Sequence, residues 1–471
     1  MLQVKRSLPP HVAVLIFSLV AACGSIHAQG LGSIVGTLTD PSGAAIAAAP
    51  VTVTDQGTSQ TRQTVTNEQG YFVVPSLAPS TYSVKAEVSG FATYVQQGIV
   101  LQADQSATVN IALTLSKSGQ TITVDAEASQ VSTSTSSLSE VVDTRRVVDL
   151  PLNGRNAASL ALITAGTVLA PASADEGNTK TFPSDVTISA NGTRQNQTTF
   201  RLDGAMNNDI YTNVNQPFPF PDALEEFSVQ TTNYSARYGG NAGGVVNIVT
   251  KSGKNEVHGD AFEFDRNAVF NARNFFAATR DQLKRNQFGG TLGGPVVIPK
   301  LYNGREKTFF FVGYQGTRIR NTGNGQSSYV PTQAELNGDF SALLSASNPN
   351  NPLKKAVQLV NPASGAPFAG NRIPTTLFDP AALALTKYLP SATASGLVFY
   401  GASLSQNFDE TVARVDHAVS DKDRLSGRYF FDRFENAAFL DKANYLNNSS
   451  FSVIDSHNAM LNPINGSCLA Q

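Results

Sequence analysis

Apolar and polar residues alternate along much of this chain, and a period of two predicts β-strands rather than helices. The runs ETVARVDHAV (410–419) and RLSGRYFFDR (424–433) flank a short polar turn, which predicts a hairpin with one mainly apolar face and one charged face. In the second run, Leu425, Gly427, Tyr429 and Phe431 share the first face, and Ser426, Arg428, Phe430 and Asp432 share the other. In the first run, Ala413, Val415 and His417 lie opposite Val412, Arg414 and Asp416.

The same alternation predicts a small antiparallel β-sandwich over residues 31–115. A turn is expected at Asp40-Pro41-Ser42-Gly43, whose residue types favour tight turns. A half-buried strand is expected around Val84, Ala86 and Val88. The closing strand of this sandwich places Val109, Ile111, Leu113 and Leu115 on one face.

Residues 140–255 predict a compact α/β unit. We expect a short helix over 157–163, two strands around an Asn191-Gly192 turn, and Phe200 and Leu202 on one side of the second strand. A further short helix is expected to carry Glu225-Glu226 on its face. Five glycines lie between Tyr234 and Gly253, around the apolar strand VVNIV. Glycine permits both positive φ and close backbone approach, so this strand is expected to pack tightly against its surroundings.

Beyond residue 256 the pattern predicts strands only. QFGGTLGGPVVIP (287–299) and KTFFFVGYQGTR (307–318) predict another hairpin, and we expect five to seven strands in all. The polar stretch 320–405 is too long for an ordinary connection. Short turns, long loops, and aromatic faces opposite charged faces are typical of a transmembrane β-barrel, in which closure of the sheet satisfies every lipid-facing backbone group. A soluble sandwich produces a similar alternation.

Between the first two units, residues 116–139 form a serine-rich linker. The linker contains an isolated β-prone string, QTITVDAEAS (120–129). Such a string is either a stray linker segment or a strand offered to the sheet edge of a partner, where main-chain hydrogen bonds supply affinity.

Composition adds few constraints on function. The 471 residues carry 34 basic and 36 acidic side chains, so no basic field is available for nucleic acid, and we expect no nucleic-acid partner. Cys23 and Cys468 lie close to opposite ends of the chain, which makes a disulfide framework improbable. The first 28 residues have the charged, apolar and small-residue regions of a signal peptide with cleavage after Ala28. The alternative is a lipoprotein box that ends in an acylated Cys23.

Catalytic chemistry is not supported by the sequence, and we expect no enzyme, no cofactor and no metal site. The histidines show no metal-ligand spacing; they are His11, His27, His258, His417 and His457. Asp203 is interpreted as a turn residue in preference to an acid catalyst. Arg155 and Arg201 are interpreted as ion-pair partners on the unit's surface in preference to residues that line a substrate path.

Several motifs occur in one order: DLPLNGRN, RLDGAMNND, EEFSVQTTNYSARYGGNAGGVVNIVTKSG, VHGDAFEFDRN, NQFGGTLGGPV and RVDHAVSDKDRLSGRYFF. The chain resembles TonB-dependent outer-membrane receptors of the Oar-like type. Residues 31–115 resemble a carboxypeptidase-regulatory-like domain, through VTNEQGYFVVPSLAPSTYSVKAEVSGF. The resemblance implies a mainly β fold: an N-terminal transthyretin-like β-sandwich, an α/β plug (140–255), and the first strands of an incomplete transmembrane antiparallel β-barrel (256–471).

The resemblance also implies partners and a binding segment. These are the periplasmic energy-coupling protein TonB, outer-membrane lipid, and a large solute whose identity the sequence does not reveal. The implied TonB box consists of Thr121, Ile122, Thr123, Val124, Asp125 and Ala126. In the family this segment adds as a strand to TonB, and transmitted force then remodels the plug.

A complete receptor barrel of this class needs about 22 strands, so we expect a truncated barrel, because only 215 residues follow Glu256. The implied function is energy-coupled uptake of a large solute across the outer membrane. The alternatives are a soluble or surface β-rich protein for adhesion or carbohydrate binding, and a plug that survives alone as a TonB-binding decoy. Association with the outer membrane that resists detergent separates uptake from the soluble alternative.

Overall fold

The computed structural model describes residues 30–115, 121–125, 138–150, 152, 154–169, 187–234, 238–273, 275, 280, 282–322, 326–401, 403–420 and 423–465. The predicted signal segment 1–28 and Ala126 lie outside the described residues. Strands dominate, which confirms the predicted mainly β fold. No helix in the described ranges is both long and apolar enough to cross a membrane.

The first unit, which we call the sandwich (residues 30–115 with 121–125), packs two sheets around one apolar core. One sheet has the order β4-β1-β7, with β8 also on β1, and the other has the order β3-β2-β5-β6-β9. The strands are β1 (Gly32–Thr39), β2 (Pro50–Asp55), β3 (Thr61–Val65), β4 (Tyr71–Leu77), β5 (Ser80–Ala86), β6 (Thr93–Leu101), β7 (Ser106–Thr108), β8 (Ile111–Ala112) and β9 (Thr121–Asp125).

The predicted β-sandwich is confirmed, with two corrections. The turn at Asp40 forms as expected, since the Gly43 N–H donates to the Asp40 carbonyl. The sandwich is not purely antiparallel, because β1 pairs parallel with both β7 and β8. Leu115 does not share the buried face of Val109; it lies beyond β8, where it forms only an isolated antiparallel bridge with Phe91, and its side chain is exposed.

The string that was predicted to be isolated is an edge strand of the sandwich. Residues Thr121 to Asp125 form β9, which pairs in parallel with the first half of β6. The expectation of an unattached segment is therefore wrong. The backbone groups along this edge of β6 find their partners in β9, which a local sequence pattern does not reveal.

The second unit, the α/β unit (residues 138–250), is built on a five-stranded sheet of order β10-β15-β16-β13-β14. Its strands are β10 (Leu138–Asp143), β11 (Thr167–Leu169), β12 (Ile188–Ala190), β13 (Thr198–Leu202), β14 (Ala205–Met206), β15 (Leu224–Thr232) and β16 (Gly244–Thr250). Its helices are α2 (Thr144–Asp149) and the 3₁₀ turns η1 (Ala157–Ile163), η2 (Gln195–Gln197) and η3 (Pro221–Ala223).

Most local predictions for the α/β unit agree with the structure. The short helix at 157–163 is η1, and Asn191 and Gly192 form the expected turn with positive φ at both residues. Phe200 and Leu202 are both buried. The predicted helix at Glu225-Glu226 is wrong, because both residues belong to β15, whose pairing with β10 and β16 imposes an extended backbone.

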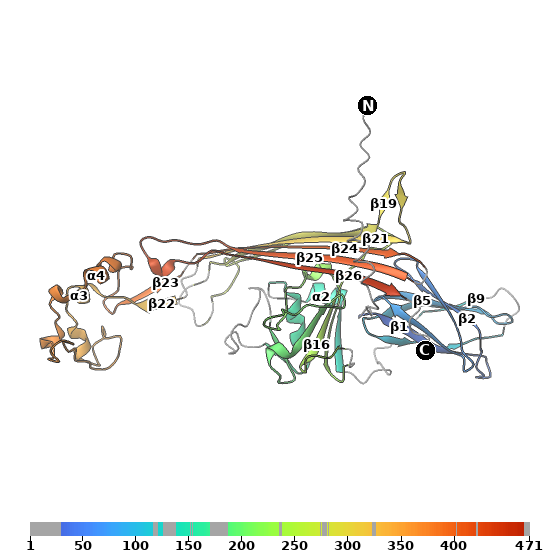
Figure 1. Ribbon diagram of the computed structural model, residues 1–471, viewed down its shortest axis with the longest axis horizontal. Coiled ribbons are helices and arrows are strands. Elements are labelled where there is room, and N and C mark those ends of the chain that lie inside the picture. Colours follow the sequence, from blue (N-terminus) through green and yellow to red (C-terminus); the bar gives the residue numbers. More distant parts are fainter. Residues whose placement is uncertain are drawn as a thin grey trace, which may run out of the picture.

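The third unit, the long sheet, contains six antiparallel strands in sequence order. They are β17 (His258–Asn267), β18 (Lys284–Pro295), β21 (Thr308–Thr322), β24 (Ser403–Ala418), β25 (Asp423–Asn436) and β26 (Ser452–Asn465). The small hairpin of β19 (Val297–Ile298) and β20 (Tyr302–Asn303) joins β18 to β21. The sheet does not close on itself, since β17 and β26 are its two edges. Figure 1 shows the α/β unit and the sandwich on one side of this sheet.

The long sheet has inverted polarity in one respect: it buries charged side chains on its covered face, together with Phe311, Val412 and Phe430, and exposes apolar side chains on the other face. Arg428 and Asp432 are buried beneath the α/β unit, whereas Tyr429 on the opposite face is 45% exposed. Further apolar side chains share that exposed face: Phe288, Leu292, Val312, Val415, Leu425 and Leu461. This alternation agrees with the predicted faces of the hairpin 410–433, and it does not favour the soluble alternative.

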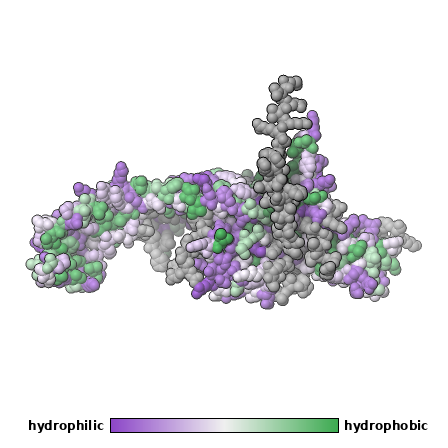
Figure 2. Space-filling model, viewed as in Figure 1, coloured by the Kyte–Doolittle hydropathy of each residue, from purple (hydrophilic) through white to green (hydrophobic). Residues whose placement is uncertain are grey.

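The polar stretch 320–405 contains a folded lobe (residues 326–401) at the far end of β21 and β24 (Figure 1). Its elements are β22 (Gln326–Tyr329), α3 (Gln333–Leu336), η5 (Ser341–Leu344), η6 (Ala369–Asn371), η7 (Thr375–Leu377), α4 (Pro380–Thr386) and β23 (Leu397–Tyr400). Buried amide side chains organise it. Asn371, for example, donates to the Val357 carbonyl and accepts from the Leu359 N–H. Figure 2 shows hydrophobic and hydrophilic residues mixed over its surface.

The connection between β25 and β26 contacts the lobe. It contains η8 (Tyr445–Asn447), and the Tyr445 ring stacks on Tyr388 with 4.4 Å between ring centroids. The Tyr445 N–H also donates to the Tyr388 carbonyl. The two long connections therefore form one structure at the same end of the sheet, while the short turns lie at the opposite end.

The glycine-rich stretch 234–253 packs closely against its neighbours, as expected. Gly244 has φ +140°, which favours glycine, and a Cβ on Gly243 would lie 2.8 Å from the Gln197 carbonyl oxygen. Where the chain leaves β16 for the long sheet, a Cβ on Gly253 would lie 2.3 Å from the Phe310 oxygen and 2.6 Å from the Gly294 oxygen. At Gly253, the chain can therefore pass this close to the backbone of the long sheet only because the residue has no side chain.

We predict that Gly253→Ala lowers the free energy of unfolding by about 1–3 kcal/mol, because the methyl group must displace the sheet backbone. The matched control is Gly427→Ala, where the nearest atom to an added Cβ is 3.8 Å away. Urea titration of both variants in detergent micelles measures the difference. Equal effects at the two positions would contradict the close approach.

Candidate functional site: the charged contact between the α/β unit and the long sheet

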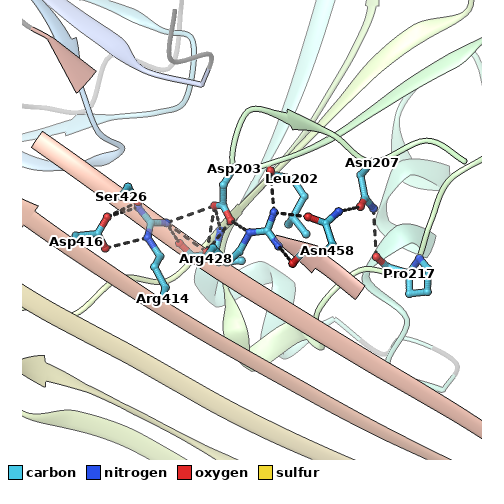
Figure 3. A network of polar contacts seen from close by, with 10 residues as sticks. Leu202, Asp203, Asn207, Pro217, Arg414, Asp416, Ser426, Arg428 and Asn458 are labelled. Carbon is cyan, nitrogen blue, oxygen red and sulfur yellow. Dashed lines mark hydrogen bonds and ion pairs between the residues drawn. The ribbon is translucent and has the colours of Figure 1, made fainter. Parts of the chain in front are cut away.

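Asp203 occupies a tight turn directly after β13, with φ +50°. Its own N–H donates to the Ile248 carbonyl, and its carboxylate accepts from the N–H and the hydroxyl of Thr250. These bonds hold the turn to the end of β16. The side chain is 4% exposed and points toward the long sheet (Figure 3).

Two arginines of the long sheet meet this carboxylate. The Arg428 Nε lies 2.6 Å from one Asp203 oxygen, and the Arg414 Nη1 lies 3.3 Å from the other. The Arg428 side chain is fully buried, and the Arg414 side chain is 13% exposed. A buried guanidinium without a counter-charge is very costly, so the fully buried Arg428 requires Asp203 of the α/β unit beside it.

The network extends to both sides of the central contact (Figure 3). Asp416 accepts two hydrogen bonds from Arg414 and one from the Ser426 hydroxyl. With Asp203, this gives two carboxylates for two guanidinium groups, so the cluster is neutral. On the other side, Arg428 donates to the Leu202 carbonyl and to the Asn458 side chain.

An amide ladder continues from Asn458 into the α/β unit. The Asn458 side-chain N–H donates to the Asn207 amide oxygen, and Asn207 donates to the carbonyls of Gln216 and Pro217. Backbone and side chains of the unit are therefore bonded to three consecutive strands of the sheet, β24, β25 and β26.

Arg155 forms a second contact, in the DLPLNGRN motif. It makes an ion pair with Asp222 of the same unit, and both side chains are about nine-tenths buried. Its guanidinium stacks over Phe264 at 4.0 Å and Phe262 at 4.9 Å, both on β17. The preceding Gly154 carbonyl accepts from Gln287 on β18. The interpretation as an ion pair is correct, but the pair is buried against the sheet and does not lie on the unit's surface.

The sandwich contacts the α/β unit through backbone and carboxylate groups. The Ala103 N–H donates to Glu226 Oε2 at 2.9 Å, and Asn247 donates to Asp104 at 3.0 Å. In the connection between β16 and β17, Asn255 donates to the carbonyls of Gly57 and Thr58 of the sandwich. A cavity of about 110 Å³ lies at this three-way junction, between Asp55 of the sandwich, Asp203 and Arg414, among other residues.

The remaining candidate residues lie apart from this cluster. The TonB-box-like residues Thr121, Ile122, Thr123, Val124 and Asp125 form β9 on the sandwich. Arg201 packs its guanidinium over the Tyr238 ring at 5.3 Å and donates to the Gly204 carbonyl. Among the described residues, no group of three His, Cys, Asp or Glu side chains is placed to hold a metal ion.

Sequence reasoning placed Arg414, Asp416 and Arg428 on the charged face of a hairpin without identifying their partner. The signal that could have found it is the isolated acidic residue of RLDG. A strand followed directly by Asp-Gly predicts a turn that exposes the carboxylate to whatever covers the strand end. The arginines on the charged face of the hairpin are then the expected partners of this carboxylate.

Two protein families match parts of the chain. The family described as outer membrane beta barrel domain matches residues 249–464, and the carboxypeptidase regulatory-like domain family matches residues 33–114. The TonB-dependent transporter Oar of Myxococcus xanthus is 25% identical over 319 residues. That alignment covers 64% of this chain and 29% of the relative, so the chain spans less than a third of the relative's length.

Among solved structures, the chain is similar to the ferric enterobactin receptor PfeA from Pseudomonas aeruginosa, with a TM-score of 0.37, 15% identity, and coverage of 64% of this chain and 33% of that one. It is also similar to the outer membrane transporter YddB from Escherichia coli, with a TM-score of 0.36, 9% identity, and coverage of 65% and 34%.

We predict that Asp203→Asn lowers the free energy of unfolding by about 3–5 kcal/mol, because two buried guanidinium groups lose their shared counter-charge. The control is Asp455→Asn, which breaks the exposed Arg433–Asp455 pair and should cost about 0–1 kcal/mol. Urea titration in detergent micelles measures both. If Asp203→Asn is as mild as the control, the ion pairs do not hold the unit to the sheet.

The contact at Glu226 should depend on pH. Burial raises the pKa of Glu226 to about 7 from its ordinary 4.5, despite the hydrogen bond from Ala103. A raised pKa means that the contact favours the protonated carboxyl, so its contribution is complete below about pH 4.5 and is lost as the pH rises through about 7.

We therefore expect protection of the Ala103 amide against hydrogen exchange, corrected for the intrinsic rate, to fall on the order of 100-fold across this pH range. Glu226→Gln resembles the protonated acid and should remove that dependence. Identical pH profiles for the two proteins would exclude Glu226 as the titrating group.

Proposed function

We propose that the chain is a TonB-dependent receptor of the Oar-like type that serves in energy-coupled uptake of a large solute across the outer membrane. Its matches to the outer membrane beta barrel domain and the carboxypeptidase regulatory-like domain support this proposal. The observation that carries the proposal is the inverted polarity of the long sheet. Its charged face is covered by a folded unit and its apolar face is open. That is the arrangement of a barrel wall around a plug.

The long sheet is the part that meets outer-membrane lipid in this proposal. Its exposed face carries aromatic and aliphatic side chains, including Tyr314 and Tyr429. Charges on that face lie toward the end that bears the lobe, where Arg318 pairs with Asp409 at 2.7 Å. An apolar band bounded by polar and aromatic residues is the pattern that lipid requires.

The α/β unit is the plug in this proposal. It lies against the inward face of the sheet, and the Asp203 and Arg155 contacts hold it there. Because the Asp203 cluster is neutral and largely shielded from water, it stabilises the resting position. Movement of the unit would separate buried charges, so opening requires work from outside the barrel.

Energy for that movement comes, in this proposal, from TonB pairing with Thr121, Ile122, Thr123, Val124, Asp125 and Ala126. β-branched residues favour the extended backbone that strand addition needs. The proposed signal peptide, residues 1–28, exports the chain to the periplasm. The sandwich and the short turns then lie on the periplasmic side, with the lobe outside the cell.

The lobe is the part that the arriving solute meets first. It carries a cavity of about 560 Å³ lined by Tyr329, Leu336, Phe340, Phe378 and Leu383, among other residues. This volume is within the usual range for ligand pockets. Its apolar lining favours a solute with an exposed apolar part.

We predict that Val124→Pro abolishes capture of the full chain by the soluble periplasmic part of TonB, since proline removes a backbone donor and disfavours strand pairing. Val124→Thr keeps a β-branched side chain and serves as the matched control, which should retain binding. A pull-down from detergent-solubilised membranes provides the measurement. Capture that survives the proline would exclude the segment as the TonB box.

A further inference from the structure

Among the described residues, the outer edge of β9 has no strand partner. In the five-stranded sheet of the sandwich, β9 is the last strand, and its pairing with β6 uses only one of its two edges. Within the part of the chain that the structure describes, no other strand pairs with the opposite edge. A strand edge of this kind presents unpaired N–H and C=O groups, which are a template for another strand.

The position of β9 keeps this edge away from the plug. Its five residues pair with residues 93–97, at the start of β6, whereas the contacts with Glu226 and Asn247 come from Ala103 and Asp104, beyond the end of β6. The six residue steps from Gln97 to Ala103 span about 20 Å in an extended chain. Figure 1 shows β9 at the end of the sandwich remote from the α/β unit.

Three of the four β9 side chains that the structure describes are available for recognition. Thr121, Thr123 and Val124 are exposed, with Val124 at 38%, and Ile122 is half-buried. β9 is therefore held mainly by backbone hydrogen bonds to β6, and the sandwich buries little of the described side-chain surface of β9. A partner strand can thus read both the free edge and the alternate side chains.

We propose that the sandwich is a presenting platform for TonB: it holds residues 121–125 extended, and TonB adds its own strand to the outer edge of β9 while β9 stays paired with β6. This inference rests on the proposed function, since it assigns TonB to this segment. The result is one continuous sheet across two proteins. The sandwich then takes part in energy coupling with TonB and is more than a spacer.

Pre-ordering is the physical advantage of this arrangement. A free five-residue segment must lose backbone freedom when it is captured, whereas β9 has already lost it within the sandwich. The competing arrangement requires β9 to leave β6 before TonB can pair with it. That route breaks the hydrogen bonds between β9 and β6 and leaves the edge of β6 unpaired. Under that arrangement, the pairing of β9 with β6 would weaken the binding of TonB.

A disulfide staple distinguishes the two routes. Val95 on β6 is paired with Thr123 on β9, and neighbouring strands are close enough for a disulfide. The test protein is the full chain in detergent micelles with Val95→Cys and Thr123→Cys, and with Cys23 and Cys468 replaced by serine. The control staple joins Thr52→Cys and Gln63→Cys, paired on β2 and β3 far along the sheet.

Binding of the soluble periplasmic part of TonB is measured before and after reduction. The presenting platform predicts that the oxidised β6–β9 staple binds within about threefold of the reduced protein, or more tightly. A loss of about tenfold or more on oxidation, absent from the control staple and reversed by reductant, would overturn the inference and leave the proposed function intact. Failure of the reduced, unstapled chain to bind TonB would instead overturn both.

Discussion

The pairing of Asp203 with Arg414 and Arg428 is the interaction on which the arrangement of this protein depends. The long sheet places two largely buried guanidinium groups on one face, where Asp416 of the sheet supplies one carboxylate and Asp203 of the α/β unit supplies the other. The same face contributes Phe311, Val412 and Phe430 to the apolar core of the unit. Charge and apolar contact therefore act together to hold the unit against the sheet.

This contact is one of a series that connects the sandwich, the α/β unit and the long sheet. The sandwich is bonded to the α/β unit through Glu226 and Asp104, and the unit is bonded to three strands of the sheet. The sandwich also bonds directly to the long-sheet unit, since Gln60 donates to the Glu306 carbonyl. Movement of the α/β unit away from the sheet would separate the buried ion pairs. Breaking such pairs is costly, which suits a structure that must stay closed until work is done on it.

The sequence predicted the faces of the strands well, because a period of two is a local property. Tyr429 and Arg428 lie on the sides that the alternation assigns to them. Pairings between distant residues, such as Asp203 with Arg428, depend on how the α/β unit packs on the long sheet. Such packing leaves no local pattern in the sequence. The helix predicted at Glu225-Glu226 is a strand because two neighbouring strands override local propensity. The docking of β9 was missed for the same reason.

The central claim is that the apolar face of the long sheet meets lipid, and spin labels along β25 test it most directly. Labels are placed singly on the full chain in outer-membrane vesicles, and their collisions with oxygen and with a water-soluble nickel chelate are compared. The account predicts high oxygen contact at positions 425, 427, 429 and 431, and low contact with both reagents at positions 426, 428, 430 and 432. High nickel contact at the first set would contradict it.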